Sequence, residues 1–406
     1  MTANQSMHRS FWLLLRIVLV LLLLVLGGCR QRAERRRAAA TATSQAAASQ
    51  AATSQAAQSP AAPAGASQPG SQAAESAAAA ALRTVTEDGG RLDWSRARNL
   101  IAFDRRDANG VYQIWTITPE GANETCLTCN QPNAPVHHKG NPAWHPSGDF
   151  IVFQASTQSD GLLAALATPG IGRNNNLWLM SADGRTYVQL TQVAEGMGVL
   201  HPHFSEDGSR LLWAEKSGAM RPLRGEAEEW TLRVADFVTS GGAPRLENIQ
   251  SYQPLGRTFY ESHGFSPDGS RILFTAFLQP DEANAAWMDI YTLDLAAGSV
   301  TRLTDSPEVW DEHAHYSPDG RTIVWASSAD CQCDPTRLRT LQMDLWQMQA
   351  DGANKTRVTN LVASSASRRL VVDNSWGPDG RQVAVLIVDG SAPQQGTIAI
   401  VTLNTP

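Results

Sequence analysis

Hydrophobic and polar positions along the chain follow one pattern that recurs six times. An aromatic residue is followed by a polar turn, often Ser-Pro-Asp-Gly or a near variant, and then by two variable residues and an apolar triplet. The copies begin roughly 50 to 60 residues apart, a period that suits a four-stranded propeller blade and is too long for leucine-rich or ankyrin units. They span residues 94–103, 144–153, 204–213, 265–274, 316–325 and 376–385.

Each repeat is expected to form four short antiparallel strands. In Pro267-Asp268-Gly269 the proline fixes φ, the aspartate accepts local backbone hydrogen bonds and the glycine takes the left-handed conformation, so this segment predicts a hairpin between strands one and two. The apolar triplet is strand two, and alternating segments such as 290–293 form strand three. Strand four ends in a Leu-Thr or Val-Thr pair in four repeats. The third repeat departs most, because its strand three, 230–235, precedes a long stretch without such a pair.

The two ends of the repeat array predict how the ring closes. The sixth repeat runs through 398–401 and lacks a strand four, whereas residues 83–86 precede the first repeat like an isolated strand four. The pattern therefore predicts an all-β fold, a six-bladed β-propeller of four-stranded blades, closed by an N-terminal strand that completes the last blade. Such closure removes two exposed sheet edges. The alternative is an open array with an unstructured leader at 82–90.

The repeats resemble those of the TolB-type six-bladed propellers. The resemblance covers about residues 82–404, and the Gly-His and Trp-Asp signatures of WD-type repeats are missing. It implies the fold but little about function, because similar blades serve as scaffolds, lyases and peptidase caps.

The N-terminus has the features of an export signal. Arg9 and Arg16 flank an apolar run, 17–26, that ends in Leu26-Gly27-Gly28-Cys29. This ending resembles the bacterial lipobox, which implies a signal peptide over 1–28, cleavage before Cys29 and lipidation of its thiol. Two alternatives stay open: an uncleaved signal anchor formed by 11–26, and a cytoplasmic orientation, since five arginines follow the apolar run.

The remaining chain divides into a tether and the propeller. Residues 38–81 are almost entirely Ala, Ser, Gln, Thr, Pro and Gly with little charge, so we expect 29–81 to be a disordered tether that holds the domain at 82–406 away from a membrane. The expected location is extracytoplasmic and membrane-anchored. A net charge of −6 and the absence of a long basic stripe disfavour a nucleic-acid partner.

Four cysteines besides Cys29 form two close pairs. Outside the cytoplasm such pairs tend to be oxidised, so we expect two local disulfides. A zinc site that combines the first pair with His137 and His138 has suitable ligand types and remains an alternative. The pairs are Cys126 with Cys129 and Cys331 with Cys333.

Histidines and acids gather before the repeat turns, where strand one is expected to lie nearest the ring axis. Because residues i and i+2 of a strand face the same way, His201 and His203 should point together, as should His313 and His315. Converging imidazoles and carboxylates can bind a divalent metal or carry out acid–base chemistry, or they can simply cap strand ends. His145, in a turn, is expected to lie away from this mouth. The predicted ligand-binding residues are His201, His203, Glu261, His263, Glu312, His313 and His315, with His201, His313 and His315 as metal candidates.

No other catalytic motif stands out. There is no Gly-x-Ser-x-Gly elbow, phosphate-binding loop or His-Glu-x-x-His. The leading hypothesis is a non-enzymatic binding module that recruits a protein or glycan through one mouth of the ring and needs no cofactor. The alternative is a metal-assisted carbohydrate lyase or hydrolase. Some propeller polysaccharide lyases hold a metal with histidines at this face, and the chain resembles them only in class.

Overall fold

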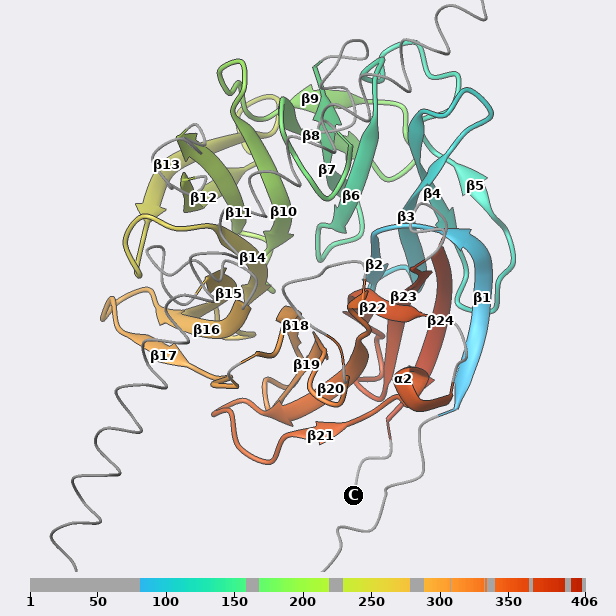
Figure 1. Cartoon of the computed structure of the whole chain (residues 1–406). Coiled ribbons are helices and arrows are strands. Elements are labelled where there is room, and N and C mark those ends of the chain that lie inside the picture. Colours follow the sequence, from blue (N-terminus) through green and yellow to red (C-terminus); the bar gives the residue numbers. More distant parts are fainter. Residues whose placement is uncertain are drawn as a thin grey trace, which may run out of the picture. The chain divides into compact units, whose positions relative to one another are not determined.

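The computed structural model describes residues 81–157, 168–218, 229–277, 288–306, 308–331, 333, 340–364, 368–390 and 396–403. They form six four-stranded antiparallel sheets arranged as the blades of a propeller (Figure 1). The six-bladed prediction is therefore confirmed. The proposed signal peptide, Cys29 and nearly all of the tether lie outside the described residues. Within those ranges no helix is long and apolar enough to span a membrane.

The strands occupy four equivalent positions in the blades. The innermost strands are β2 (Leu92–Ser95), β6 (Lys139–Trp144), β10 (Gly198–Phe204), β14 (Tyr260–Phe265), β18 (Asp311–Tyr316) and β22 (Arg369–Trp376). The second strands are β3 (Leu100–Arg106), β7 (Phe150–Ser156), β11 (Arg210–Gly218), β15 (Arg271–Phe277), β19 (Thr322–Ser327) and β23 (Gln382–Asp389). The third strands are β4 (Tyr112–Ile117), β8 (Asn175–Ser181), β12 (Glu229–Val238), β16 (Met288–Asp294), β20 (Asp344–Gln349) and β24 (Gly396–Thr402). The outer strands are β5 (Thr125–Cys126), β9 (Tyr187–Gln189), β13 (Arg245–Tyr252), β17 (Val300–Arg302), β21 (Thr356–Arg357) and β1 (Leu82–Gly89), and a short helix, α2 (Leu361–Ser364), follows β21.

The repeated turn has the hydrogen bonds that its residues predict. In blade four the Ser266 hydroxyl donates to Oδ1 of Asp268, 2.5 Å away, and accepts from the amide of Arg271. Gly269 has a φ of +68°, which a residue with a side chain rarely adopts. The apolar triplets that follow these turns are core, as at Ile151-Val152-Phe153, where each residue is fully buried.

The Leu-Thr and Val-Thr pairs fasten the third strand of four blades. Thr359 illustrates the arrangement: its hydroxyl accepts from the amide of Leu345 at 2.9 Å and donates to Oδ1 of Asp344 at 2.6 Å. Equivalent bonds join Thr128, Thr191 and Thr304 to the amides of Ile114, Leu177 and Ile290. Blade three lacks this pair, and its outer strand β13 is long and mostly exposed. The sequence pattern did not predict that strand.

The N-terminal strand closes the ring. β1 pairs with β24 in antiparallel register, from Leu82 with Val401 to Gly89 with Gly396, in the sheet β1-β24-β23-β22. Val85 on β1 is buried in a core shared by the last and first blades. The innermost strands also meet around the whole ring, because β22 contacts β2. The predicted closure is therefore confirmed.

Candidate functional site on the ring axis

A repeated bulge shapes the innermost strands. In five of the six blades the pairing between strands one and two shifts register just before the repeat aromatic, for example between Leu200 and His203 and between Glu312 and His315. Two of the residues in these bulges, His201 and His313, have left-handed backbones with φ of 48° and 54°. Bulges re-aim side chains and are over-represented next to active sites. The i, i+2 rule used for the sequence prediction does not hold across them.

The histidines consequently pair at two levels. The ring of His201 packs against that of His313 with centroids 5.1 Å apart, and the ring of His203 packs against that of His315 at 5.3 Å. His263 contacts both levels, with centroid distances of 5.4 Å to His313 and 6.3 Å to His315. We call His201 and His313 the deep pair and His203 and His315 the mouth pair, because the mouth pair lines a pocket described below.

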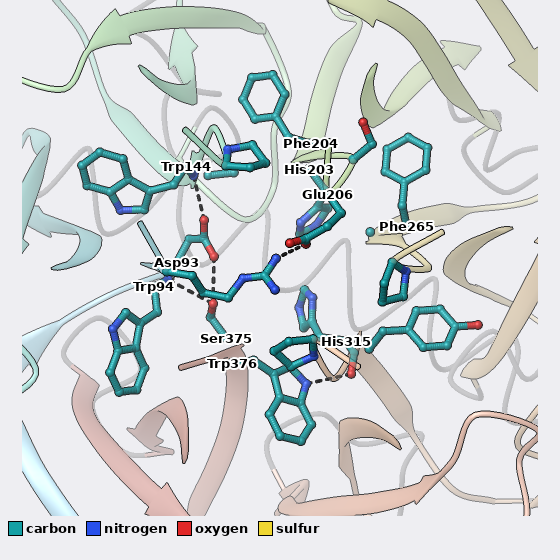
Figure 2. Close-up of a pocket in the computed structure, with 18 of the residues that line it drawn as sticks. Asp93, Trp94, Trp144, His203, Phe204, Glu206, Phe265, His315, Ser375 and Trp376 are labelled. Carbon is teal, nitrogen blue, oxygen red and sulfur yellow. Dashed lines mark hydrogen bonds and ion pairs between the residues drawn. The ribbon is translucent and has the colours of Figure 1, made fainter. Parts of the chain in front are cut away.

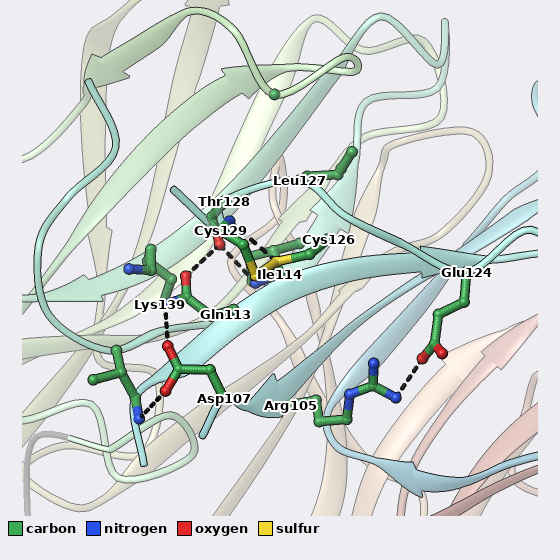
Figure 3. Close-up of a disulfide and its surroundings, with 12 residues drawn as sticks. Arg105, Asp107, Gln113, Ile114, Glu124, Cys126, Leu127, Thr128, Cys129 and Lys139 are labelled. Carbon is green, nitrogen blue, oxygen red and sulfur yellow. Dashed lines mark hydrogen bonds and ion pairs between the residues drawn. A yellow bond between two sulfur atoms is a disulfide. The ribbon is translucent and has the colours of Figure 1, made fainter. Parts of the chain in front are cut away.

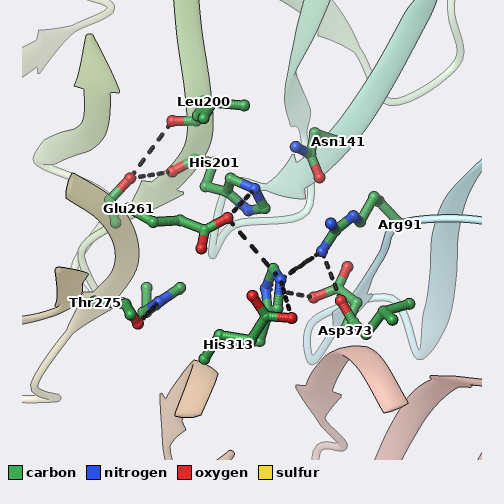
Figure 4. A network of polar contacts seen from close by, with 12 residues as sticks. Arg91, Asn141, Leu200, His201, Glu261, Thr275, His313 and Asp373 are labelled. Atoms are coloured by element: carbon green, nitrogen blue, oxygen red, sulfur yellow. Dashed lines mark hydrogen bonds and ion pairs between the residues drawn. The ribbon is translucent and has the colours of Figure 1, made fainter. Parts of the chain in front are cut away.

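The deep pair surrounds a carboxylate from the blade between them (Figure 4). Oε1 of Glu261 lies 2.7 Å from Nε2 of His201 and 3.9 Å from Nε2 of His313, and all three residues are buried. Their ligand atoms lie within 4.8 Å of one another, so this trio could hold a metal ion. The predicted metal ligands were His201, His313 and His315. In the structure the third member of the group is Glu261, and His315 belongs to the mouth pair.

Arg91, which the sequence pattern did not reveal, adds a positive charge beside the deep pair and Glu261, and we call these four residues the deep cluster. Its Nη1 lies 2.8 Å from Nε2 of His313 and donates to the carbonyl of Val372 at 2.6 Å. Asp373, nearby, accepts from the amide of Leu92 and lies 3.9 Å from Nδ1 of His313. A positional signal was available in the sequence, because three residues before each repeat aromatic stand Arg91, Asn141, His201, Ser262, His313 and Asp373.

Neighbouring blades hold the bulged backbones in place. Ser262 donates to the carbonyl of His201 at 2.7 Å, and the side-chain amide of Asn374 donates to the carbonyl of His313 at 2.6 Å. Left-handed backbone at a residue other than glycine costs of order 1–3 kcal/mol and persists only where the surroundings enforce it. Both deep-pair histidines are thus fixed by side chains from the next blade.

Burial dominates the protonation of the deep cluster and of nearby acids. It raises the pKa of Glu312 to about 8, helped by the negative charge of Glu261, and it raises the pKa of Asp104 to about 7. Burial also acts to raise the pKa of Glu261, but His201, His263 and Arg91 outweigh it and bring that pKa to about 2. The pKa of His313 falls well below its usual range because of burial and Arg91. The cluster thus combines one ionised carboxylate with a neutral imidazole.

The mouth pair lines a small pocket on the face of the propeller that carries the Ser-Pro-Asp-Gly turns (Figure 2). We call this pocket the mouth. Its volume is about 190 Å³, and residues from all six blades line it. Asp93 joins three blades there, since its carboxylate accepts from the amide of Trp144 at 2.7 Å and from the hydroxyl of Ser375 at 2.8 Å. Arg96 and Glu206, from blades one and three, form an ion pair among the lining residues.

The imidazoles of the mouth are poor bases because they are buried. Burial lowers the pKa of His263 to about 3 and that of His315 to about 4, in both cases with help from neighbouring histidines, and it lowers the pKa of His203 as well. His145 lines the same pocket, so the expectation that it lies away from the mouth is wrong. Its ring packs against Phe204 of blade three, and its Nε2 lies 3.2 Å from the carbonyl of Gly208 in the turn of that blade.

Other predicted site residues lie elsewhere. His138 accepts from the amide of Tyr112 at 3.2 Å. Cys126 and Cys129 are joined by a disulfide beside Thr128 (Figure 3), with Cα atoms 5.6 Å apart. Cys331 and Cys333 form a second disulfide, with Cα atoms 5.1 Å apart. Neither thiol of the first pair is thus available for the zinc site considered with His137 and His138.

Comparison with known proteins gives partial matches. No protein-family model matches the chain. An uncharacterized protein of Agrobacterium fabrum is 32% identical over 145 residues, which cover 35% of this chain and 41% of that protein. Dipeptidyl-peptidase 5 of Porphyromonas endodontalis is 21% identical over 253 residues, or 55% of this chain and 33% of that protein. The chain therefore spans less than half the length of these curated relatives.

Solved structures similar to the chain include TolB proteins and a lyase. A putative TolB from Agrobacterium tumefaciens has a TM-score of 0.49 and 16% identity, over 80% of this chain and 91% of that one. TolB from Acinetobacter baumannii has a TM-score of 0.46 and 15% identity, over 77% and 65%. An oligogalacturonate lyase in complex with manganese has a TM-score of 0.47 and 14% identity, over 80% and 93%. The closed ring of six four-stranded sheets establishes the fold of this chain independently of its similarity to these structures.

Proposed function

We propose that the protein is a membrane-tethered extracytoplasmic binding module that recruits a protein or glycan partner at the mouth of its propeller. The observation that carries the proposal is the mouth pocket, to which every blade contributes. Pockets for small molecules usually measure roughly 300–1,000 Å³. A pocket of about 190 Å³ is too small for such a ligand but can receive one side chain or one sugar ring. A larger partner would insert one such group and contact the rim.

The charges at the mouth define the chemistry of that partner. The mouth histidines are neutral at neutral pH because burial keeps their pKa values low. Arg96 is already paired with Glu206. The lining therefore favours a neutral hydrogen-bonding group, such as a sugar hydroxyl or a backbone amide, over a strongly anionic one.

Site-specific photo-crosslinking tests this proposal. A photoreactive amino acid would replace Glu206 at the mouth in the full-length, membrane-associated protein, and the matched control would replace Glu247 on the outer strand β13. We expect a discrete adduct from position 206 only, and mass spectrometry of the adduct tells protein from glycan. Equal labelling from both positions, or none from position 206, would reject the mouth as the binding surface.

A second function, metal-assisted cleavage of a carbohydrate, is favoured by one observation. The trio that could hold a metal ion lies next to the neutral imidazoles of the mouth, so that a sugar hydrogen-bonded to His315 would be close to the ion. Incubation with oligosaccharides, followed by mass spectrometry of the products, tests it. Shortened products that disappear in His315→Ala would favour the enzyme over the binding module.

A further inference from the structure

We propose that the deep cluster is a binding site for a first-row divalent cation such as zinc, with His201, Glu261 and His313 as its three protein ligands. The inference goes beyond the proposed function, because a buried ion could support either role of the mouth. It also differs from the sequence prediction, which had His315 in place of Glu261.

The first argument is the position of the donor atoms. The three ligands come from the innermost strands of three consecutive blades, β10, β14 and β18. Bonds of about 2.1 Å to a tetrahedral ion place ligand atoms roughly 3.4 Å apart. The observed separations from Oε1 of Glu261, 2.7 Å and 3.9 Å, bracket that value. Side-chain adjustments of less than an ångström would therefore complete the arrangement.

The second argument is that a buried nitrogen of His201 lacks a well-formed hydrogen bond. Nε2 of His201 is buried, and among the described residues its polar contact is Oε1 of Glu261 at 2.7 Å, a contact that falls outside ordinary hydrogen-bond geometry. A buried nitrogen without such a bond is costly and calls for an explanation. A cation bound by the imidazole and the carboxylate would satisfy both groups once their ligand atoms move from 2.7 Å to about 3.4 Å apart. Two imidazoles and one carboxylate are a ligand set that zinc sites use.

The third argument is rigidity. The carbonyls of His201 and His313 are held by Ser262 and Asn374 from adjacent blades. Outer contacts of this kind orient metal ligands in known sites. The left-handed backbones at both histidines are further evidence that these two side chains are aimed at one point.

Arg91 is the competitor that the ion must displace. Its Nη1 lies 2.8 Å from Nε2 of His313, the atom that would bind the metal. The same nitrogen donates to the carbonyl of Val372, an anchor that the guanidinium can keep while it releases the imidazole. Removal of this positive charge as Arg91→Gln should tighten zinc binding by at least about tenfold, since like charges at short range repel strongly in a buried site.

Equilibrium dialysis of the detergent-solubilised full-length protein against zinc, read by elemental mass spectrometry, tests the site. We expect one equivalent of bound zinc in the wild type and a loss of affinity of at least about tenfold in Glu261→Gln and His313→Ala. His315→Ala is the matched control, on the same strand two residues away, and should retain zinc. Glu261→Gln is nearly isosteric, so its result stands if the histidine variant fails to fold. X-ray absorption at the zinc edge should show nitrogen and oxygen ligands without sulfur.

Three results would overturn the proposal. They are the absence of stoichiometric zinc, retention of zinc in Glu261→Gln, and an equal loss in His313→Ala and His315→Ala. The assay contains no partner, and the crosslinking at position 206 needs no metal, so the metal site and the binding function can fail separately.

Discussion

Nε2 of His201 and Oε1 of Glu261 lie 2.7 Å apart on the innermost strands of adjacent blades. Burying ionisable groups costs several kcal/mol unless they are well paired, so the deep cluster adds little to the stability of the fold. The apolar triplets and the strand-fastening threonines supply that stability instead. The apolar blades can therefore tolerate a cluster of buried polar residues on their innermost strands.

Replacing Val85 tests the closure of the ring. Val85→Asp would bury an unpaired carboxylate between β1 and the last blade, which should cost about 2–4 kcal/mol and lower the melting temperature by roughly 4–10 °C. Thr84→Asp introduces the same residue at the exposed neighbouring position and should change the melting temperature by less than about 2 °C. Equal shifts, measured by scanning calorimetry, would contradict a structural role for β1.

The repeated threonines should be worth a measurable part of the stability. Thr359→Val keeps the shape of the side chain but leaves the amide of Leu345 without its acceptor, so unfolding should become easier by about 1–3 kcal/mol. Thr356→Val, on the exposed outer strand β21, is the matched control and should cost less than about 0.5 kcal/mol. Denaturant titration followed by tryptophan fluorescence measures both. A similar cost for the two variants would mean that the Val-Thr pair has no special role.

The sequence predicted the architecture well because the fold repeats. The turn residues and apolar triplets depend on local sequence, so what one repeat predicts applies to all six. The period gave the type of blade, and the isolated strand near residues 83–86 indicated how the ring closes. The outer strand of blade three was missed, since Arg245–Tyr252 lacks the Leu-Thr or Val-Thr pair and is largely exposed. Exposure removes the alternation of polar and apolar residues on which strand prediction depends.

The site was predicted less completely. The histidines were found, but their separation into two levels depends on a backbone bulge that side-chain alternation cannot reveal. His145 was misplaced because the repeat turns themselves line the pocket, which the pattern of polar and apolar residues does not reveal. Arg91 follows two glycines and lies in no motif, so only its equivalence to His201 and His313 in the repeat could have identified it.

Anchoring through Cys29 remains a prediction from the sequence. Cys29→Ser removes the only thiol that the lipobox could modify, so the variant should leave the detergent phase as released protein or accumulate as uncleaved precursor. Metabolic labelling with a fatty acid and detergent partitioning report lipidation and membrane retention. Wild-type retention without label would favour the uncleaved anchor at 11–26.

The dependence of stability on pH tests the buried acid Asp104. Burial raises its pKa to about 7, against the opposing effects of the Asn141 amide and Arg91, whereas the unfolded chain loses this proton near pH 3.9. The folded state therefore holds more protons than the unfolded state between these values. The stabilisation from the bound proton is complete below about pH 3.9 and is lost as the pH rises through 7.

Asp104→Asn removes this titration while it keeps an acceptor for the amide of Asn141. The difference in unfolding free energy between variant and wild type should move in favour of the variant by about 3 kcal/mol from pH 5 to pH 8.5. The buried histidines are present in both proteins, so their titration cancels in the difference. Asp149→Asn, at an exposed carboxylate, is the control and should change that difference by less than about 0.5 kcal/mol. Denaturant titrations at the two pH values decide the matter, and a constant difference for Asp104→Asn would mean that this carboxyl is ionised throughout.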